Sequence, residues 1–228
     1  MKRILILCMF GLCVMFAYAQ QKVQQKDVTT FLGIPVDGTK AAMRQKLIQK
    51  GFVSKRTSDG TEYFEGEFNG VDVEIYIVTN NNKVWRLYLA DVNERSEIDI
   101  RLRFNKLISQ FENNKRYVSY DNETELISEN EDISYEMTVH NKLYDAYFHQ
   151  IGDFDKQKKE AYNKLVSKYG IEDIKKLSDK ELEYLYQEYI EDAVQMKLVW
   201  FRIYGNLGNY HIGMYYDNKY NQPNGEDL

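Results

Sequence analysis

The sequence has 228 residues, of which 30 are basic and 35 acidic, and 43% of its residues are hydrophobic. Residues 1–19 hold two basic residues and no acid, so the remainder has 28 basic and 35 acidic residues and a net charge of −7. Because contacts to phosphate need a positive surface, this balance excludes nucleic acid as the main partner.

The first 19 residues have the pattern of a secretory signal peptide. Two basic residues precede an apolar run at 4–16, and the sequence AYA at 17–19 fits a cleavage site before Gln20. The apolar run is shorter than the roughly 18 to 20 residues that span a bilayer, so we expect no transmembrane anchor after cleavage. Both cysteines lie in this segment, and the mature chain is therefore expected to lack disulfides and a cysteine nucleophile.

A polar, aperiodic segment at 20–27 predicts a flexible leader, followed by a single α+β domain at 28–228. The domain opens with the stretch FLGIPVDGTKAAMRQKLIQKGF at 31–52, in which Asp37 or Thr39 is expected to cap a helix. The turn before this helix has one glycine, whereas a phosphate-binding loop has several glycines and a lysine at fixed spacing. We therefore interpret the stretch as the start of the fold and not as a ligand site.

Four strands separated by strong turn sequences are predicted after this helix. They cover Phe52–Thr57, Thr61–Phe68, Val71–Val78 and Lys83–Asp91. Asp-Gly, Asn-Gly and a run of three asparagines lie between them, and such residues favour tight turns. The pattern predicts an antiparallel meander with helices packed on one side.

A helix followed by strands recurs in the second half of the sequence. Ser96 is expected to open a helix that ends at Asn113-Asn114. Strands are predicted near Tyr117–Asp121, Ile133–His140, Leu143–Ile151, Lys197–Tyr204 and Asn209–Tyr216, with a tight turn at Asn141-Lys142. We therefore divide the domain into halves, 28–93 and 94–228, related by a helix-plus-four-strand duplication.

A charged helical insertion is predicted at 153–196. Gly170 ends its first apolar stripe, and the capping box Ser178–Glu181 opens a last helix with a wide apolar stripe. We expect this last helix to pack on the sheet. The polar tail DNKYNQPNGEDL at 217–228 is expected to lie on the surface.

Several segments together resemble a family of secreted proteins of gut Bacteroidetes. They are FLGIPVDGTK, LIQKGF, RFNKLISQFENNKRY, DISYEMTVHNK and MYYDNKYNQPNGEDL. That family has no established activity, so the resemblance implies export and not a chemical function. The order of elements is also similar to the folds of beta-lactamase-inhibitor protein and of small outer-membrane assembly lipoproteins, and this likeness concerns architecture alone.

An acidic sheet face is the candidate binding surface. If Asn69-Gly70 forms a two-residue turn, Glu67 lies opposite Asp72 and Glu65 opposite Glu74. Like charges in these positions are unfavourable. Arg86 on the next strand is expected beside or diagonal to Glu74. The face is then a partly salt-bridged solvated surface, a patch for a basic partner, or a calcium site, although calcium needs six to eight converging oxygens.

The sequence offers no motif for catalysis, for a metal or for a cofactor. Its histidines, His140, His149 and His211, do not have ligand spacing, and no known nucleophile or phosphate-loop motif occurs. His149 and Asp145 share one face of a predicted strand, where the carboxylate could orient the imidazole. We otherwise expect structural histidines.

Tyrosines are spread over the predicted strands. Those at Tyr63, Tyr76, Tyr88, Tyr135, Tyr204 and Tyr215 pack at the rim of the core or form a platform for a sugar or a protein. We therefore expect an exported, periplasmic or secreted, non-enzymatic binding module of the cell envelope, with another protein or a glycan as partner. The alternatives are a carboxylate-based hydrolase acting on glycans and a structural envelope component.

Overall fold

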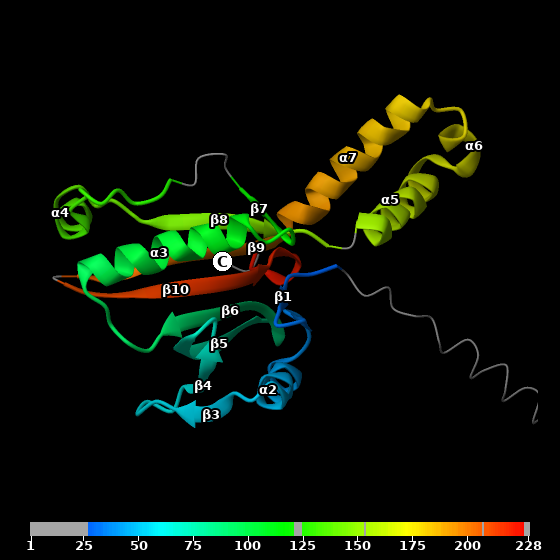
Figure 1. Cartoon of the computed structure of the whole chain (residues 1–228). Helices are drawn as coiled ribbons and strands as arrows, with labels where there is room; N and C mark the ends of the chain where they lie inside the picture. Colours follow the sequence, from blue (N-terminus) through cyan, green and yellow to red (C-terminus); the bar gives the residue numbers. More distant parts are fainter. Residues whose placement is uncertain (1–26, 121–124, 153, 207, 226–228) are drawn as a thin grey trace, which may run out of the picture.

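An eight-stranded antiparallel sheet carries the fold, in a computed structural model that describes residues 27–120, 125–152, 154–206 and 208–225 (Figure 1). Its strands are β3 (Val53–Arg56), β4 (Glu62–Phe68), β5 (Val71–Asn80), β6 (Lys83–Asp91), β7 (Tyr117–Ser119), β8 (Asp145–Gln150), β9 (Lys197–Asn206) and β10 (Asn209–Asn218). They lie in the order β3-β4-β5-β6-β10-β9-β8-β7. β1 (Thr30–Phe31) and β2 (Ile34–Pro35) form a separate two-stranded sheet. The predicted signal peptide and the leader up to residue 26 lie outside the described residues.

Six helices accompany the sheet in the described part of the chain. They are α2 (Lys40–Gln49), α3 (Glu97–Glu112), α4 (Ile133–Val139), α5 (Phe154–Tyr169), α6 (Ile171–Ile174) and α7 (Asp179–Gln195), with a short 3-10 helix at Lys219–Asn221. The fold is therefore α+β with an antiparallel sheet, as predicted. None of these helices is both long and apolar enough to cross a membrane.

The strand order is symmetric about the centre of the sheet. α2 is followed by β3 to β6, and α3 by β7 to β10 with helices inserted between them. The last strands of the two sets, β6 and β10, pair at the centre of the sheet, where Tyr88 lies opposite Tyr215. Each half therefore extends outward from this central pair.

The local predictions for the first half are confirmed. Thr39 caps α2 by accepting a hydrogen bond from the Ala42 N–H at 3.2 Å, and Gly51 ends the helix with a positive φ of 97°. Asn69 and Gly70 have φ angles of 54° and 75°, as a two-residue hairpin turn requires.

One face of the sheet is buried beneath α2 and α3, and we call it the core face. A row of apolar residues in register crosses it: Phe64, Ile75, Leu89, Met214 and Phe201. Phe104 of α3 packs edge-on against Phe201 with ring centroids 5.2 Å apart. α2 contacts β5 and β6, and α3 contacts β10 and β7 (Figure 1). The opposite surface is the outer face.

The strand predicted at 133–140 is wrong, because Ile133–Val139 is the helix α4. Asp132 accepts a hydrogen bond from the Tyr135 N–H at 2.8 Å, and Glu97 of α3 accepts one from the Ile133 N–H at 2.9 Å. These two carboxylates satisfy the donors of a first helical turn. The turn predicted at Asn141-Lys142 is consequently the exit of a helix and not a hairpin loop.

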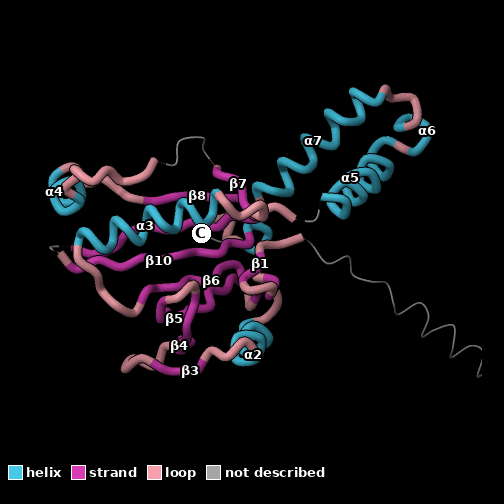
Figure 2. Tube along the Cα trace, viewed as in Figure 1, coloured by secondary structure: helices cyan, strands magenta, loops and turns pink. Residues whose placement is uncertain are grey.

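The helical insertion is present, but α7 does not pack on the sheet as predicted. α7 packs against α5, and its main contacts to the sheet are with β8 and β9. Figure 2 shows α5 and α7 extending together away from the sheet. Ala161 and Leu165 of α5 are buried, so the apolar stripes of the two helices partly cover each other.

Buried polar contacts attach the base of this insertion to the domain. The Lys197 ammonium, 1% exposed, lies 2.6 Å from Oδ2 of Asp27, which also accepts a hydrogen bond from Gln157 of α5 at 3.0 Å. The start of the domain, α5 and β9 are therefore joined at one point.

The beginning of the polar tail is buried, which corrects the expectation of a surface segment. Asp217 and Asn218 are 3% and 0% exposed. The Asn218 amide donates to the Val36 carbonyl at 2.8 Å, and Asn221 donates to the Val84 carbonyl at 2.9 Å. The tail therefore satisfies buried backbone groups of the first half.

Candidate functional site on the outer sheet face

A row of aromatic side chains crosses the outer face from β4 to the end of β7. In spatial order it consists of Tyr63, Tyr76, Tyr88, Tyr215, Trp200, Tyr147 and Tyr120, and we call it the aromatic row. Its central members are direct register partners on β5, β6, β10, β9 and β8. Residues far apart in the sequence are thus aligned by strand pairing alone.

Neighbouring rings in the row stack on each other. The successive centroid distances are 5.8, 5.8, 4.8, 3.9, 5.5 and 6.3 Å, and the first five pairs have interplanar angles between 11° and 27°. At the centre of the row, where Tyr88, Tyr215 and Trp200 stack at 4.8 and 3.9 Å, the ring faces are therefore covered by neighbouring rings. The row offers ring edges and hydroxyl groups to a partner.

The predicted tyrosines are only partly brought together. Tyr63, Tyr76, Tyr88 and Tyr215 belong to the row, and Tyr204 lies beside it, with its hydroxyl 2.6 Å from that of Tyr215. Tyr135 lies on α4, and its ring packs on that of His140. Trp200, Tyr147 and Tyr120 were not predicted as members. Counting alternate residues along β9 would have placed Trp200 on the same face as Tyr204.

An arginine–aspartate pair flanks the row on one side. Arg86 donates two hydrogen bonds to the Asp217 carboxylate at 2.6 and 2.7 Å, and the Trp200 indole N–H donates to the same carboxylate at 3.0 Å. The guanidinium lies 4.8 Å from the Tyr215 ring centre and 4.3 Å from that of Trp85. Asp217 therefore fixes both a cation and the centre of the aromatic row.

A second pair flanks the row on the other side. The Arg202 guanidinium binds the Asp145 carboxylate, with a distance of 3.1 Å from Nε, and the Tyr147 hydroxyl donates to Asp145 at 3.0 Å. Burial and the adjacent carboxylate raise the pKa of Tyr147. Both guanidiniums lie 5.5 Å from the Trp200 ring centre, so Trp200 stands between two ion pairs.

The predicted pairing of like charges is confirmed on β4 and β5. Glu65 lies opposite Glu74, and Glu67 lies opposite Asp72. We call these four residues the acidic patch. Lys55 on β3 forms an ion pair with Glu65, which relieves the first pair.

The acidic patch also contacts the aromatic row. Glu74 accepts a hydrogen bond from the Tyr76 hydroxyl at 2.6 Å, and burial together with this carboxylate raises the pKa of Tyr76. Glu67 and Asp72 are exposed, and within the described chain neither has an ion pair or a side-chain hydrogen bond. Their charges are therefore available to a partner.

The predicted contact between Arg86 and Glu74 is wrong. Arg86 lies opposite Val78, and the Tyr76–Tyr88 pair separates it from Glu74. Arg86 binds Asp217 instead, because β10 inserts beside β6 and presents its carboxylate directly opposite. No local sequence pattern predicts that β6 pairs with the last strand.

The histidines do not form a catalytic group. His149 is buried, and burial and the charge of Lys219 lower its pKa. Asp145 lies on the same strand but binds Arg202, so it does not orient the His149 imidazole. His211 stacks on Tyr204 at 5.7 Å.

The described residues contain no group of three or more histidine, cysteine or acidic side chains that could hold a metal ion. The carboxylates of the acidic patch follow the strands in rows instead of converging on a point. Comparison of the chain with models of protein families, with curated proteins and with solved structures gave no match. The outer face is therefore the part of the molecule that indicates a function.

Proposed function

We propose that this protein is an exported, non-enzymatic binding module of the cell envelope, and that its outer face docks a basic protein. The observation that carries the proposal is the aromatic row beside the acidic patch. Tyrosine and tryptophan provide much contact area at little cost in conformational entropy, and they are enriched in protein interfaces. Here they are already held in place by stacking, so little ordering remains for a partner to impose.

The charge of the surface favours a basic partner. Glu67 and Asp72 oppose each other without a cation among the described residues, whereas Arg86 and Arg202 are each bound to an aspartate. Lysine or arginine side chains of a partner would relieve this repulsion and would also speed the encounter.

The stacking favours a protein over a glycan. Sugars bind to aromatic residues through the open face of a ring, and at the centre of the aromatic row the ring faces stack on neighbouring rings. Ring edges and hydroxyl groups suit the mixed polar and apolar surface of a protein. No observation on the outer face favours the carboxylate-based hydrolase.

Export is part of the proposal and depends on the predicted cleavage before Gln20. N-terminal sequencing of the mature protein from fractionated cells tests it. A mature chain that begins at Gln20 in the periplasm or the medium supports export. An uncleaved chain in the cytoplasm contradicts it.

Capture from a cell-envelope extract by three forms of the protein tests the docking surface. The forms are the natural protein, the patch variant Glu67→Lys/Asp72→Lys, and the control Glu94→Lys/Glu129→Lys, which makes the same charge change at exposed positions elsewhere. We expect a basic protein to be retained by the natural protein and the control and lost by the patch variant. Equal capture by all three forms, or capture by none, contradicts the proposal.

A further inference from the structure

The insertion, residues 154–195, is a helical hairpin whose two long helices have opposite charge. α5 contains five lysines and two acids, and α7 contains six acids and one lysine. The hairpin extends away from the sheet, so its far end is not part of the outer face (Figures 1 and 2). It therefore offers a surface separate from the proposed docking site.

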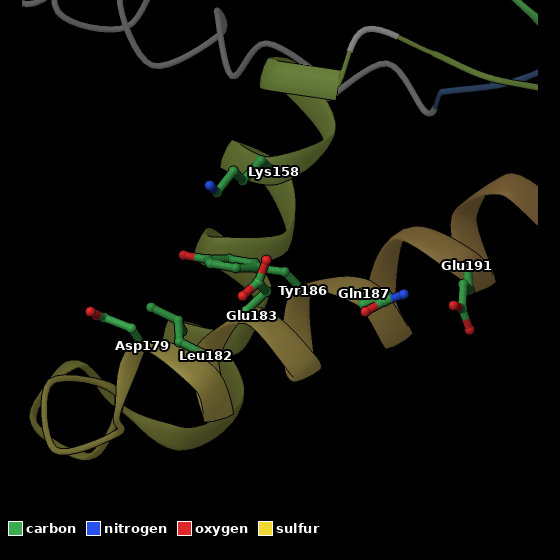
Figure 3. A pocket seen from close by; sticks show the side chains of 7 residues that line it. All are labelled: Lys158, Asp179, Leu182, Glu183, Tyr186, Gln187 and Glu191. Atoms are coloured by element: carbon green, nitrogen blue, oxygen red, sulfur yellow. The ribbon is translucent and has the colours of Figure 1, made fainter.

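A groove runs along one side of the hairpin (Figure 3). Its α7 wall carries a row of side chains spaced four residues apart: Asp179, Glu183, Gln187 and Glu191. Leu182 and Tyr186 lie beside this row, and Lys158 of α5 lies on the other wall. An apolar strip next to an acidic row is the surface that an amphipathic helix with basic residues fits.

The charges of the two helices are only weakly coupled within one hairpin, where the Glu188 carboxylate of α7 contributes to raising the pKa of Lys168 of α5. Among the described side chains, no ion pair joins α5 to α7. The lysines of α5 contact tyrosines instead: Lys158 lies 5.6 Å from the Tyr186 ring centre, and Lys164 lies 4.7 Å from that of Tyr189. The acidic row thus remains free for a cation from another molecule.

The apolar stripes are also incompletely covered. Leu182, Leu185 and Tyr186 are half-buried, and Tyr184 is 70% exposed. Two helices alone cannot enclose a stripe as wide as that of α7, whereas four helices can.

We propose that the hairpins of two copies of this chain pack together as a four-helix bundle, with α5 of each copy against α7 of the other. A twofold axis makes both contacts identical, and each brings a basic helix against an acidic one. A second copy of the chain is the partner that the structure favours, because its basic α5 complements the acidic α7 of the first copy. The proposal goes beyond docking on the outer face and does not depend on it.

The size of the hairpin sets the expected affinity. Helices of 16 and 17 residues are about 25 Å long, and two together are about 20 Å wide, so one side covers about 500 Å². Two such sides bury about 1,000 Å², near the lower limit for a specific interface. We therefore expect a dimer in the micromolar range that weakens as salt rises.

Two complementary charge variants test the proposal by sedimentation at low salt. The first, Lys158→Glu/Lys159→Glu, makes α5 acidic, and the second, Glu183→Lys/Glu191→Lys, makes α7 basic. Each variant alone is expected to raise the dimer dissociation constant by about tenfold or more, which corresponds to about 1.4 kcal/mol. An equimolar mixture is expected to restore the dimer, because each acidic helix then meets a basic one.

The mixing experiment distinguishes loss of the charge contact between the two copies from unfolding of the variants. A restored heterodimer requires both variants to be folded, and circular dichroism checks their helix content independently. The control Glu94→Lys/Glu129→Lys is expected to dimerise like the natural protein. The proposal is overturned if the natural protein is monomeric at about 100 µM, or if the helical variants do not associate when mixed.

Discussion

The indole of Trp200 stacks on the ring of Tyr215 with centroids 3.9 Å apart and an interplanar angle of 11°. This is the closest ring contact in the aromatic row, and it lies one strand from the junction of the two halves of the sheet. The indole N–H also donates to Asp217. Trp200 therefore connects the row to the Arg86–Asp217 ion pair.

Substitutions of Trp200 separate the contribution of ring stacking to stability from that of the hydrogen bond to Asp217. Trp200→Ala removes the stacking and the hydrogen bond, and it is expected to lower the free energy of unfolding by about 2–3 kcal/mol. Trp200→Phe keeps an aromatic ring and loses the hydrogen-bond donor, so it is expected to lower the free energy of unfolding by about 1 kcal/mol. Urea unfolding measures both, with Leu143→Ala at an exposed position as control. An equal cost for both substitutions would show that the hydrogen bond, and not stacking, dominates.

The repulsion between carboxylates of the acidic patch is expected to lower the free energy of unfolding. Glu67→Gln removes the repulsion with Asp72 and should raise the free energy of unfolding by about 0.3–1 kcal/mol. Because salt screens exposed charges, the gain should shrink in high salt. The same variant should bind the proposed basic partner less tightly, since stability and function are often opposed at binding sites.

Measurement at low and high salt with Glu94→Gln as control separates a local effect from a general one. Glu94 is exposed and lies away from the patch. A destabilised Glu67→Gln would mean that Glu67 makes a favourable contact, and the patch would then be structural.

The contrast between Glu67 and Arg86 shows how far the sequence predicts this surface. The pairing of Glu67 with Asp72 follows from the Asn-Gly turn between neighbouring strands, so it was predicted correctly. The partner of Arg86 lies 131 residues away in the chain. No local turn fixes that register, and only the pairing of β6 with β10 does so.

The error at α4 has a similar cause. The alternation of Ile133 and its neighbours fits a strand, and the competing signal was the cap provided by Asp132. Half of the cap comes from Glu97 on another helix, which no local pattern reveals. Likewise, the stripe of α7 predicted a helix correctly but could not show that α5, instead of the sheet, would cover it.

The Arg86–Asp217 pair is expected to be strongly coupled. Asp217→Ala leaves a half-buried guanidinium without its carboxylate and should destabilise the protein by about 3 kcal/mol. The double substitution Arg86→Met/Asp217→Leu removes both charges and should cost less than the sum of the single substitutions. A double-mutant cycle by urea unfolding measures the coupling, and strict additivity would contradict it.

His149 is expected to make stability depend on pH. Burial lowers its pKa in the folded state, while the unfolded value is about 6.5. Between these two values the unfolded chain binds more protons, so stability falls as the pH drops below about 6.5, by at most about 1.4 kcal/mol per pH unit. The slope between about pH 7.5 and 5.5 should be smaller in His149→Gln than in the natural protein. A His149→Gln protein with the slope of the natural protein would assign the effect to other groups.

Substitutions at Gly38 test whether the opening turn is structural. Gly38 has a φ of 87°, and a side chain added there meets no atom within 4 Å, so any cost comes from the backbone conformation and not from a clash. Asparagine tolerates this region, and a β-branched residue does not. We expect Gly38→Asn to lower the free energy of unfolding by less than about 1 kcal/mol and Gly38→Val by about 2 kcal/mol or more. Binding at the outer face should be unchanged in both variants at temperatures where they are folded. A Gly38→Val protein as stable as the natural one, but unable to bind the partner, would transfer the binding site to this turn.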